Sequence, residues 1–146
     1  MKQMKKFILG CAVSLPVSLS VLAADPIKLG LLEDASGNFA LAVIPKIHAT
    51  QLAVEEINAK GGVLGRPIKL IHYDTQSDNT KFQEFARRLI QTDKPDVIFG
   101  GYSSASREAI RPIMDKAKQL YFYNNQYEGG VCDSNTFATG VCKSLK

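Results

Sequence analysis

The sequence of 146 residues predicts an α/β fold with a doubly wound parallel sheet. Short apolar stretches of strand length alternate with longer stretches in which apolar residues recur at helical spacing, a pattern typical of parallel strands joined by right-handed helical crossovers. Residues 97–99, Val-Ile-Phe, show no polar alternation, as expected of a strand covered on both faces. An apolar content of 45% and a charged content of 22% are normal for a globular protein of one domain.

Residues 1–24 predict a secretory signal peptide. They combine a lysine-bearing start, an apolar run over residues 7–22 and small residues at Ala23 and Ala24, so we expect cleavage after one of these two alanines. The apolar run is shorter than the roughly 20 residues that a membrane-spanning helix needs, and Pro16 interrupts it. The chain is therefore expected to be exported rather than anchored in a membrane.

The charge of the remaining chain argues against a nucleic-acid partner. The formal net charge is +4, but Lys2, Lys5 and Lys6 lie in the predicted signal peptide. Without these three lysines, 15 basic residues stand against 14 acidic ones, which leaves no basic surface for phosphate backbones.

Neither the cysteines nor the histidines predict a metal site. Cys11 lies in the signal peptide, which leaves Cys132 and Cys142 either to form a disulfide in an oxidising compartment or to remain unpaired small residues. His48 and His72 are isolated in the sequence, and the cysteines lack the spacing of zinc ligands. We expect no metal and no cofactor.

The first strand is predicted over residues 27–32, and a loop follows over residues 33–38. Ser36 and Gly37 in this loop either present a hydroxyl and backbone N–H groups to a ligand or serve only as turn residues. Both readings are compatible with the end of a parallel strand.

The first helix is predicted over residues 44–60, where apolar residues recur at helical spacing. Pro45 is compatible with a first turn, and the two glycines at 61–62 are typical of a helix end. The second strand is predicted over residues 68–74.

The second helix is predicted to begin at Thr80, because Thr80 and Gln83 have the spacing of a capping box. It ends before the Asp-Lys-Pro sequence at residues 93–95. An apolar stripe predicts its core face, with Phe82, Phe85, Ala86, Leu89 and Ile90.

The third strand, over residues 96–99, is followed by two glycines at 100–101 that allow a sharp exit. A third helix is predicted after Ser106, and Pro112 should remove one hydrogen bond and kink it. The fourth strand is predicted over residues 120–123.

Polar and aromatic residues follow the third and fourth strands, at 102–104 and 123–128. Because the carboxyl ends of adjacent parallel strands meet at one edge, these residues are expected to line one small-molecule site. Their phenol, hydroxyl and carboxamide groups suit a ligand with amide or amino-acid groups. A secreted hydrolase using Ser104 with Glu128 or Asp74 is an alternative, but the chain has no G-x-S-x-G motif and no histidine near Ser104 in sequence. We therefore do not expect an enzyme.

Several segments occur together in a familiar order: I-K-L-G-L-L at residues 27–32, E-E-I-N-A-K-G-G-V-L-G-R at 55–66, and D-V-I-F-G-G-Y-S-S at 96–104. With them, the chain resembles the type I periplasmic solute-binding proteins of ABC transporters, of the leucine-binding family. The segment Y-N-N-Q-Y-E-G-G at 123–130 is similar to the Y-x-x-x-Y-E-G segment of the branch that binds urea and short amides. The resemblance covers about residues 27–140.

The resemblance implies a non-catalytic periplasmic receptor, in which two α/β lobes close on a small ligand and then dock on a membrane permease. At the matching positions it implies that Tyr102, Ser104, Tyr123 and Asn125 line the ligand site, and Ser36 is a further candidate from the first loop. The ligand is expected to be urea, a short amide or a branched-chain amino acid, and Asn125 with the paired tyrosines favours urea or an amide. An amide-sensing regulatory protein is the alternative that the signal peptide argues against.

The chain departs from this family in length. Relatives continue through a second lobe, whereas residues 141–146 here replace the segment that usually follows Gly140. We therefore expect a signal peptide at 1–24, most of an N-terminal lobe over 25–140 and an aberrant tail at 141–146, as in a truncated or frameshifted product. A single lobe leaves one side of the ligand exposed to water, so the chain as given is expected to bind weakly or not at all.

Overall fold

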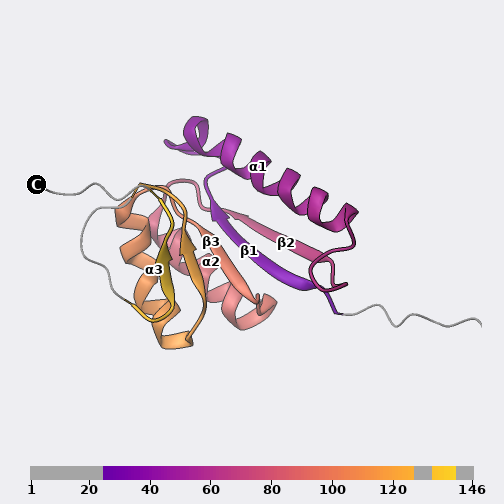
Figure 1. Ribbon diagram of the computed structural model, residues 1–146. Helices are drawn as coiled ribbons and strands as arrows, with labels where there is room; N and C mark the ends of the chain where they lie inside the picture. Colours follow the sequence, from indigo (N-terminus) through magenta and orange to yellow (C-terminus); the bar gives the residue numbers. More distant parts are fainter. Residues whose placement is uncertain (1–24, 127–132, 141–146) are drawn as a thin grey trace, which may run out of the picture.

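Five parallel strands form one sheet in the computed structural model, which describes residues 25–126 and 133–140 (Figure 1). The strand order is β2-β1-β3-β4-β5, and every adjacent pair is parallel. The first four strands confirm the sequence prediction, whereas β5 is an addition to it. Their bounds are Ile27–Glu33 for β1, Ile68–Asp74 for β2, Val97–Gly100 for β3, Tyr121–Tyr123 for β4 and Thr136–Ala138 for β5.

Several predicted features lie outside the described residues. These are the signal peptide at 1–24, the tail at 141–146, and both Cys132 and Cys142. The cleavage site and the pairing of the two cysteines therefore stay predictions.

Helices cover both faces of the sheet, which confirms the doubly wound architecture (Figure 1). Helix α1, Ala40–Ala59, lies on one face, and α2, Asn79–Arg88, packs beside α3, Ser104–Ala117, on the other. Helix α2 runs on into a π-helical segment, η1, Leu89–Asp93. No helix among the described residues is long and apolar enough to cross a membrane.

The two faces of the sheet have separate cores of unequal size. On the α1 side, the buried apolar residues in the described part of the chain are Leu31, Val43 and Ile47. The core on the other side includes three residues of the predicted stripe of α2 and η1, and its members are Leu32, Phe82, Ala86, Leu89, Ile98, Ile110, Met114, Tyr121 and Tyr123. Because burial of apolar area drives folding, most of the stabilisation comes from the side of α2 and α3.

Helix α1 begins at Ala40 rather than at the predicted Ile44. Pro45 therefore lies inside the helix instead of its first turn, and it leaves the carbonyl of Leu41 without a helical N–H partner. Because Leu41 is 93% exposed at the open start of the helix, water can hydrate this carbonyl. The helix ends before the glycines at 61–62, as predicted.

Helix α2 is capped by Asp78, so the prediction of a cap at Thr80 is wrong. The Asp78 carboxylate accepts hydrogen bonds from the backbone N–H groups of Thr80 at 2.7 Å and Lys81 at 3.3 Å. These two bonds lower the pKa of Asp78 below its usual value. Asp78 is itself a strong capping residue, and its extended backbone places the carboxylate over the first turn.

Asp78→Ala should therefore lower the melting temperature by several degrees, because two N–H groups of the first turn lose their acceptor. Thr80→Ala is the matched control, since it removes only the side-chain hydrogen bond of Thr80 to Asp78 and keeps both backbone bonds, so it should change the melting temperature less. Thermal unfolding followed by circular dichroism measures both. Equal losses in the two variants would contradict the assignment of the cap.

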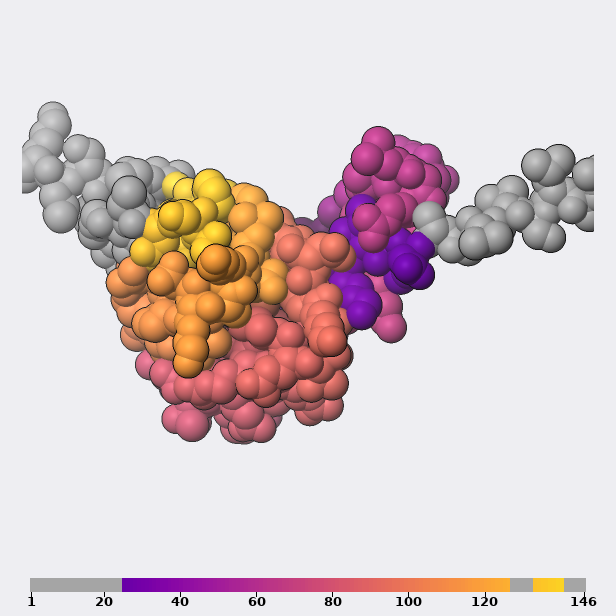
Figure 2. Space-filling view, turned by 90° about the horizontal axis from the view of Figure 1, so that it is seen from below, coloured from indigo at the N-terminus to yellow at the C-terminus, as the bar shows by residue number. Residues whose placement is uncertain are grey.

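A stripe of stacked phenylalanines crosses the sheet on the α1 side. The ring centroids of Phe99 and Phe122 lie 5.0 Å apart, and those of Phe122 and Phe137 lie 5.3 Å apart. A groove of about 470 Å³ lies between α1 and residues of β1, β2 and β3, and Phe99 is the member of the stripe that lines it. Figure 2 shows the hollow between α1, in magenta, and the orange and yellow segments. Phe137 is 45% exposed, so the described residues leave the end of this stripe open to solvent.

Candidate functional site

The candidate site is built on the turn that ends β3. Gly100 and Gly101 have φ values of 135° and 94°, which glycine adopts far more readily than other residues. The Gly101 N–H donates to the carbonyl of Leu32 on β1 at 3.0 Å, and the Tyr121 hydroxyl on β4 donates to the carbonyl of Gly100 at 2.9 Å. These bonds tie the turn to both neighbouring strands and hold Tyr102 at the carboxyl edge of the sheet.

Four of the predicted ligand-binding residues line one open pocket of about 190 Å³. They are Tyr102, Ser104, Tyr123 and Asn125, and Gln126 joins them as a residue that the sequence prediction missed. The pocket forms because β3 and β4 are adjacent, as predicted, so the residues that follow them meet at one edge. These five described residues offer hydroxyl, phenol and carboxamide groups to the pocket and no charged group.

Tyr123 forms a buried part of this pocket and is 1% exposed. Its hydroxyl donates to the carbonyl of Tyr102 at 3.0 Å, and the Asn125 Nδ2 donates to the same carbonyl. The guanidinium of Arg107 lies 5.0 Å from the centre of the Tyr123 ring, on its face. These contacts fix the backbone at Tyr102 and shape the pocket.

Helix α3 begins at Ser104, with Ser103 as its N-cap, earlier than the predicted start after Ser106. The Ser103 Oγ accepts a hydrogen bond from the Ser106 N–H at 3.1 Å. The hydroxyl of Ser103 therefore caps the helix, whereas Ser104 lines the pocket. The first N–H groups of α3 add donors at this edge that suit a ligand oxygen.

Ser36 is not among the residues that line the pocket. Its Oγ donates to Asp74 Oδ2 at 2.7 Å, while Asp74 Oδ1 accepts from the N–H groups of Ala35 at 2.9 Å and Ser36 at 3.1 Å. Burial alone would raise the pKa of Asp74, but these hydrogen bonds and one from Gln76 outweigh it and lower the pKa. The geometry favours the turn role of Ser36 over the ligand role.

Phe39 is an aromatic residue at this edge that the sequence prediction missed. Its ring centroid lies 4.9 Å from that of Tyr102, with the planes tilted by 35°, and 36% of Phe39 is exposed. A large aromatic residue in a polar loop directly after a strand was the available signal. Phe39 does not itself line the pocket, and its ring packs against that of Tyr102, which does.

A buried ion pair lies behind the turn. Glu33, the last residue of β1, is 1% exposed, and its Oε1 is 2.7 Å from the Nζ of Lys46 on α1. The same Nζ donates to the carbonyl of Gly101 at 3.3 Å. Burial raises the pKa of Glu33 to about 7, although the nearby Lys46 cation acts in the opposite direction. The pair joins α1, β1 and the turn before Tyr102, and no sequence motif indicated it.

Among the residues that the structure describes, neither Asp74 nor His72 is placed to act as a base for Ser104 in the hydrolase alternative. Asp74 is occupied by the turn around Ser36, and His72 Nε2 lies 3.1 Å from the carbonyl of Glu33. Glu128, the other proposed base, lies outside the described residues. Within residues 25–126 and 133–140 there is also no group of three or more His, Cys, Asp or Glu side chains that could hold a metal ion.

Comparison with known families gives a match over nearly all of the described chain. A family model described as "Periplasmic binding protein" matches residues 26–144. The Leu/Ile/Val-binding protein homolog 7 of Brucella melitensis biotype 1 is 36% identical over 119 residues, and homolog 8 of Brucella abortus is 33% identical over 122 residues. Each alignment covers 82% of this chain and 30% of the relative, so the chain spans about a third of the length of these proteins.

Two crystal structures extend the likeness to the fold. The LivJ substrate-binding protein of Streptococcus pneumoniae, in complex with isoleucine, superposes with a TM-score of 0.65 at 28% identity, covering 67% of this chain and 28% of that one. The leucine-binding protein LivK of Thermotoga maritima gives 0.61 at 29% identity, covering 66% and 27%. The names of these four proteins refer to branched-chain amino acids or to leucine, isoleucine and valine, and none refers to urea or an amide.

Proposed function

The chain belongs to the periplasmic binding protein family, and from this premise we propose that it is a ligand-binding lobe of an exported substrate-binding component of an ABC transporter. One observation carries the proposal: residues after β3 and β4 together line an uncharged pocket at the carboxyl edge of the sheet. This is a family of binding proteins, in agreement with the prediction that the chain is not an enzyme.

The same proposal includes the location of the protein and its partner. The predicted signal peptide and the family together favour the periplasm, with a membrane permease as the protein partner. Residues 25–140 then form most of the N-terminal lobe, and a facing lobe in a longer form of the protein closes over the pocket. An amide-sensing regulator shares the fold, but an export signal does not suit it.

For the ligand we propose urea or a short amide. The Ser104 hydroxyl and the carboxamides of Asn125 and Gln126 each donate and accept hydrogen bonds, which matches the C=O and N–H groups of an amide. Among residues 25–126 and 133–140, no charged side chain lines the pocket to pair with an ammonium or carboxylate group.

A branched-chain amino acid is the second candidate. The observation that favours it is the likeness to Leu/Ile/Val-binding homologs and to a structure that holds isoleucine. The N–H groups at the start of α3 and the hydroxyl of Ser104 are suitable donors to the carboxylate of such a ligand.

Titration of the ¹⁵N-labelled chain with acetamide, urea and isoleucine tests both ligands. We expect acetamide and urea to shift amide signals in the segments 100–104 and 123–126, with weak affinity because one side of the site is open. Asn125→Ala should weaken that binding about tenfold, since one lost hydrogen bond is worth about 1.4 kcal/mol.

Ser36→Ala is the matched control and should leave binding unchanged, because its hydroxyl is bonded to Asp74 rather than to the pocket. If only isoleucine shifts the amide signals, the ligand is an amino acid rather than an amide. Shifts that persist unchanged in Asn125→Ala would remove the pocket assignment. A lack of shifts with all three compounds, even at concentrations that saturate a weak site, would remove the proposed function.

A further inference from the structure

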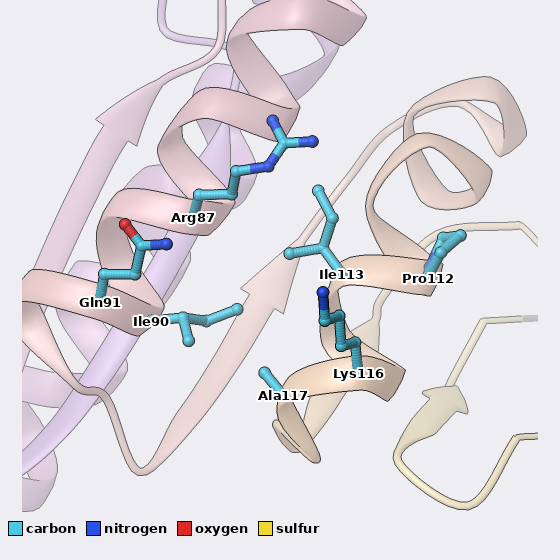
Figure 3. A pocket seen from close by; sticks show the side chains of 7 residues that line it. All are labelled: Arg87, Ile90, Gln91, Pro112, Ile113, Lys116 and Ala117. Atoms are coloured by element: carbon cyan, nitrogen blue, oxygen red, sulfur yellow. The ribbon is translucent and has the colours of Figure 1, made fainter.

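We infer that copies of this chain associate head to tail, with helix α1 of one copy seated in a groove between α2 and α3 of the next. The groove has a volume of about 510 Å³ (Figure 3). All of its lining residues come from the two helices and η1, and none comes from the sheet: they are Arg87, Ile90, Gln91, Pro112, Ile113, Lys116 and Ala117. The groove therefore lies on the outer side of this helical layer.

The groove combines an apolar floor with a cation on each wall. The Ile90 side chain points from η1 toward α3, and Ile113 points back toward it (Figure 3). Arg87 stands on the α2 wall and Lys116 on the α3 wall. Among the described residues neither cation has an ion pair, and no acidic residue lines the groove. Such a surface suits an apolar side chain with an acidic group on either side.

Both walls are irregular at the groove. The α2 wall changes to π-helical hydrogen bonding at Leu89, so Ile90 and Gln91 lie in a wider turn. The α3 wall contains Pro112, which has no N–H to offer the carbonyl of Glu108. A π turn and a proline therefore lie on facing walls of the groove, and π turns recur at functional sites.

The outer side of α1 carries the complementary pattern. Leu52 is 56% exposed although it lies in the middle of the helix. Glu55 and Glu56 follow it at i+3 and i+4, so both neighbour Leu52 on the helix surface, and they lie about 100° apart around the axis. Both carboxylates are exposed and have no ion pair among the described residues. Leu52 therefore fits between Ile90 and Ile113, with one glutamate facing each cation.

This contact has to form between copies. Helix α1 and the α2–α3 layer lie on opposite faces of the sheet, so a chain cannot fill its own groove (Figure 1). Because the two surfaces lie on opposite faces of the chain, two copies cannot exchange them reciprocally, so the contact is heterologous and adds copies in a row or a ring rather than forming a closed symmetric pair. One helix in one groove is a small interface that depends on four charges, so we expect weak association that salt reduces.

Sedimentation equilibrium of the full chain over a range of concentrations tests this inference. The weight-average mass should rise with concentration at low ionic strength and return toward that of the monomer at about 1 M NaCl, where the Debye length is about 3 Å. The double variants Arg87→Glu/Lys116→Glu and Glu55→Lys/Glu56→Lys should each stay monomeric alone. An equimolar mixture of the two should associate again, because each groove then meets a helix of opposite charge.

Lys69→Glu/Lys81→Glu changes the net charge by the same amount as the groove variant, and neither residue lines the groove, so this control should associate like the parent chain. A parent chain that stays monomeric at every concentration would overturn the inference. A mixture of the two reversed variants that stays monomeric would do the same. Association that survives both reversals would assign the contact to another surface, with the stacked phenylalanines as the first choice.

Discussion

Lys46→Met is expected to lower the free energy of unfolding by about 3 kcal/mol at pH 9 and by much less at pH 5. Glu33 is 1% exposed, and Lys46 Nζ, 2.7 Å from its carboxylate, is the cation that makes its charged form tolerable. Without that cation the carboxyl group has to stay protonated in the fold. Each pH unit above the wild-type pKa of about 7 then costs about 1.4 kcal/mol relative to the wild type. Urea denaturation at several pH values measures the difference.

The wild-type chain should itself lose stability as the pH rises from about 4.5 to about 7. The pKa of Glu33 is raised from 4.5 to about 7, so between these values the folded state binds more protons than the unfolded state. The contribution is fully present below about pH 4.5 and lost by about pH 7, and it amounts to roughly 3 kcal/mol. Other ionisable groups also change the free energy of unfolding with pH, so the test compares variants with the wild type at the same pH.

Glu33→Gln is the matched variant, because it keeps the shape of the side chain and removes the titration. It should match the wild type near pH 4 and exceed its stability by about 3 kcal/mol at pH 9. Lys46→Met added to Glu33→Gln should then show the same loss at both pH values. If Lys46→Met alone destabilises the chain equally at pH 5 and pH 9, the burial of Glu33 does not govern its protonation.

The parts of the fold that depend on local sequence were predictable. The strands from β1 to β4 are apolar and bounded by glycine or polar turns, and the order of strands and helices dictates a parallel sheet. The pocket followed from the same pattern, because Tyr102 and Asn125 come directly after strands that are adjacent in a sheet of this kind.

The missed features depend on contacts between distant residues. The hydrogen bond of Ser36 with Asp74 joins residues from different loops, and the meeting of Glu33 with Lys46 requires the orientation of α1 on the sheet. Neither contact leaves a pattern in the sequence. The start of α3 was ambiguous for another reason, since its first turn contains several serines and each one is a good capping residue. Strand β5, Thr136–Ala138, is as short as β4 but has one aromatic residue where β4 has three, so its sequence carries a weaker strand signal.

Gly100→Ala is expected to destabilise the fold by about 4 kcal/mol, because it combines backbone strain with a clash. The φ of Gly100 is 135°, a value that L-residues rarely adopt, and a Cβ added there would lie 2.0 Å from the carbonyl oxygen of Leu32. That carbonyl cannot withdraw easily, because it belongs to the adjacent strand β1 and accepts the Gly101 N–H at 3.0 Å. Relief of the clash has to move the turn, and Tyr102 with it, so amide signals around the pocket should shift in any variant that folds.

Gly61→Ala separates the cost of backbone strain from the cost of the clash. Gly61 also has a positive φ, 95°, but a Cβ there would meet no atom within 4 Å. Its replacement should therefore cost only the backbone strain, about 1 kcal/mol. Urea denaturation of both variants gives the difference, which we expect to be about 3 kcal/mol and which measures how closely β3 approaches β1 at the turn. Equal losses would show that the turn gives way at little cost, and that the close approach at Gly100 does not hold Tyr102 in place.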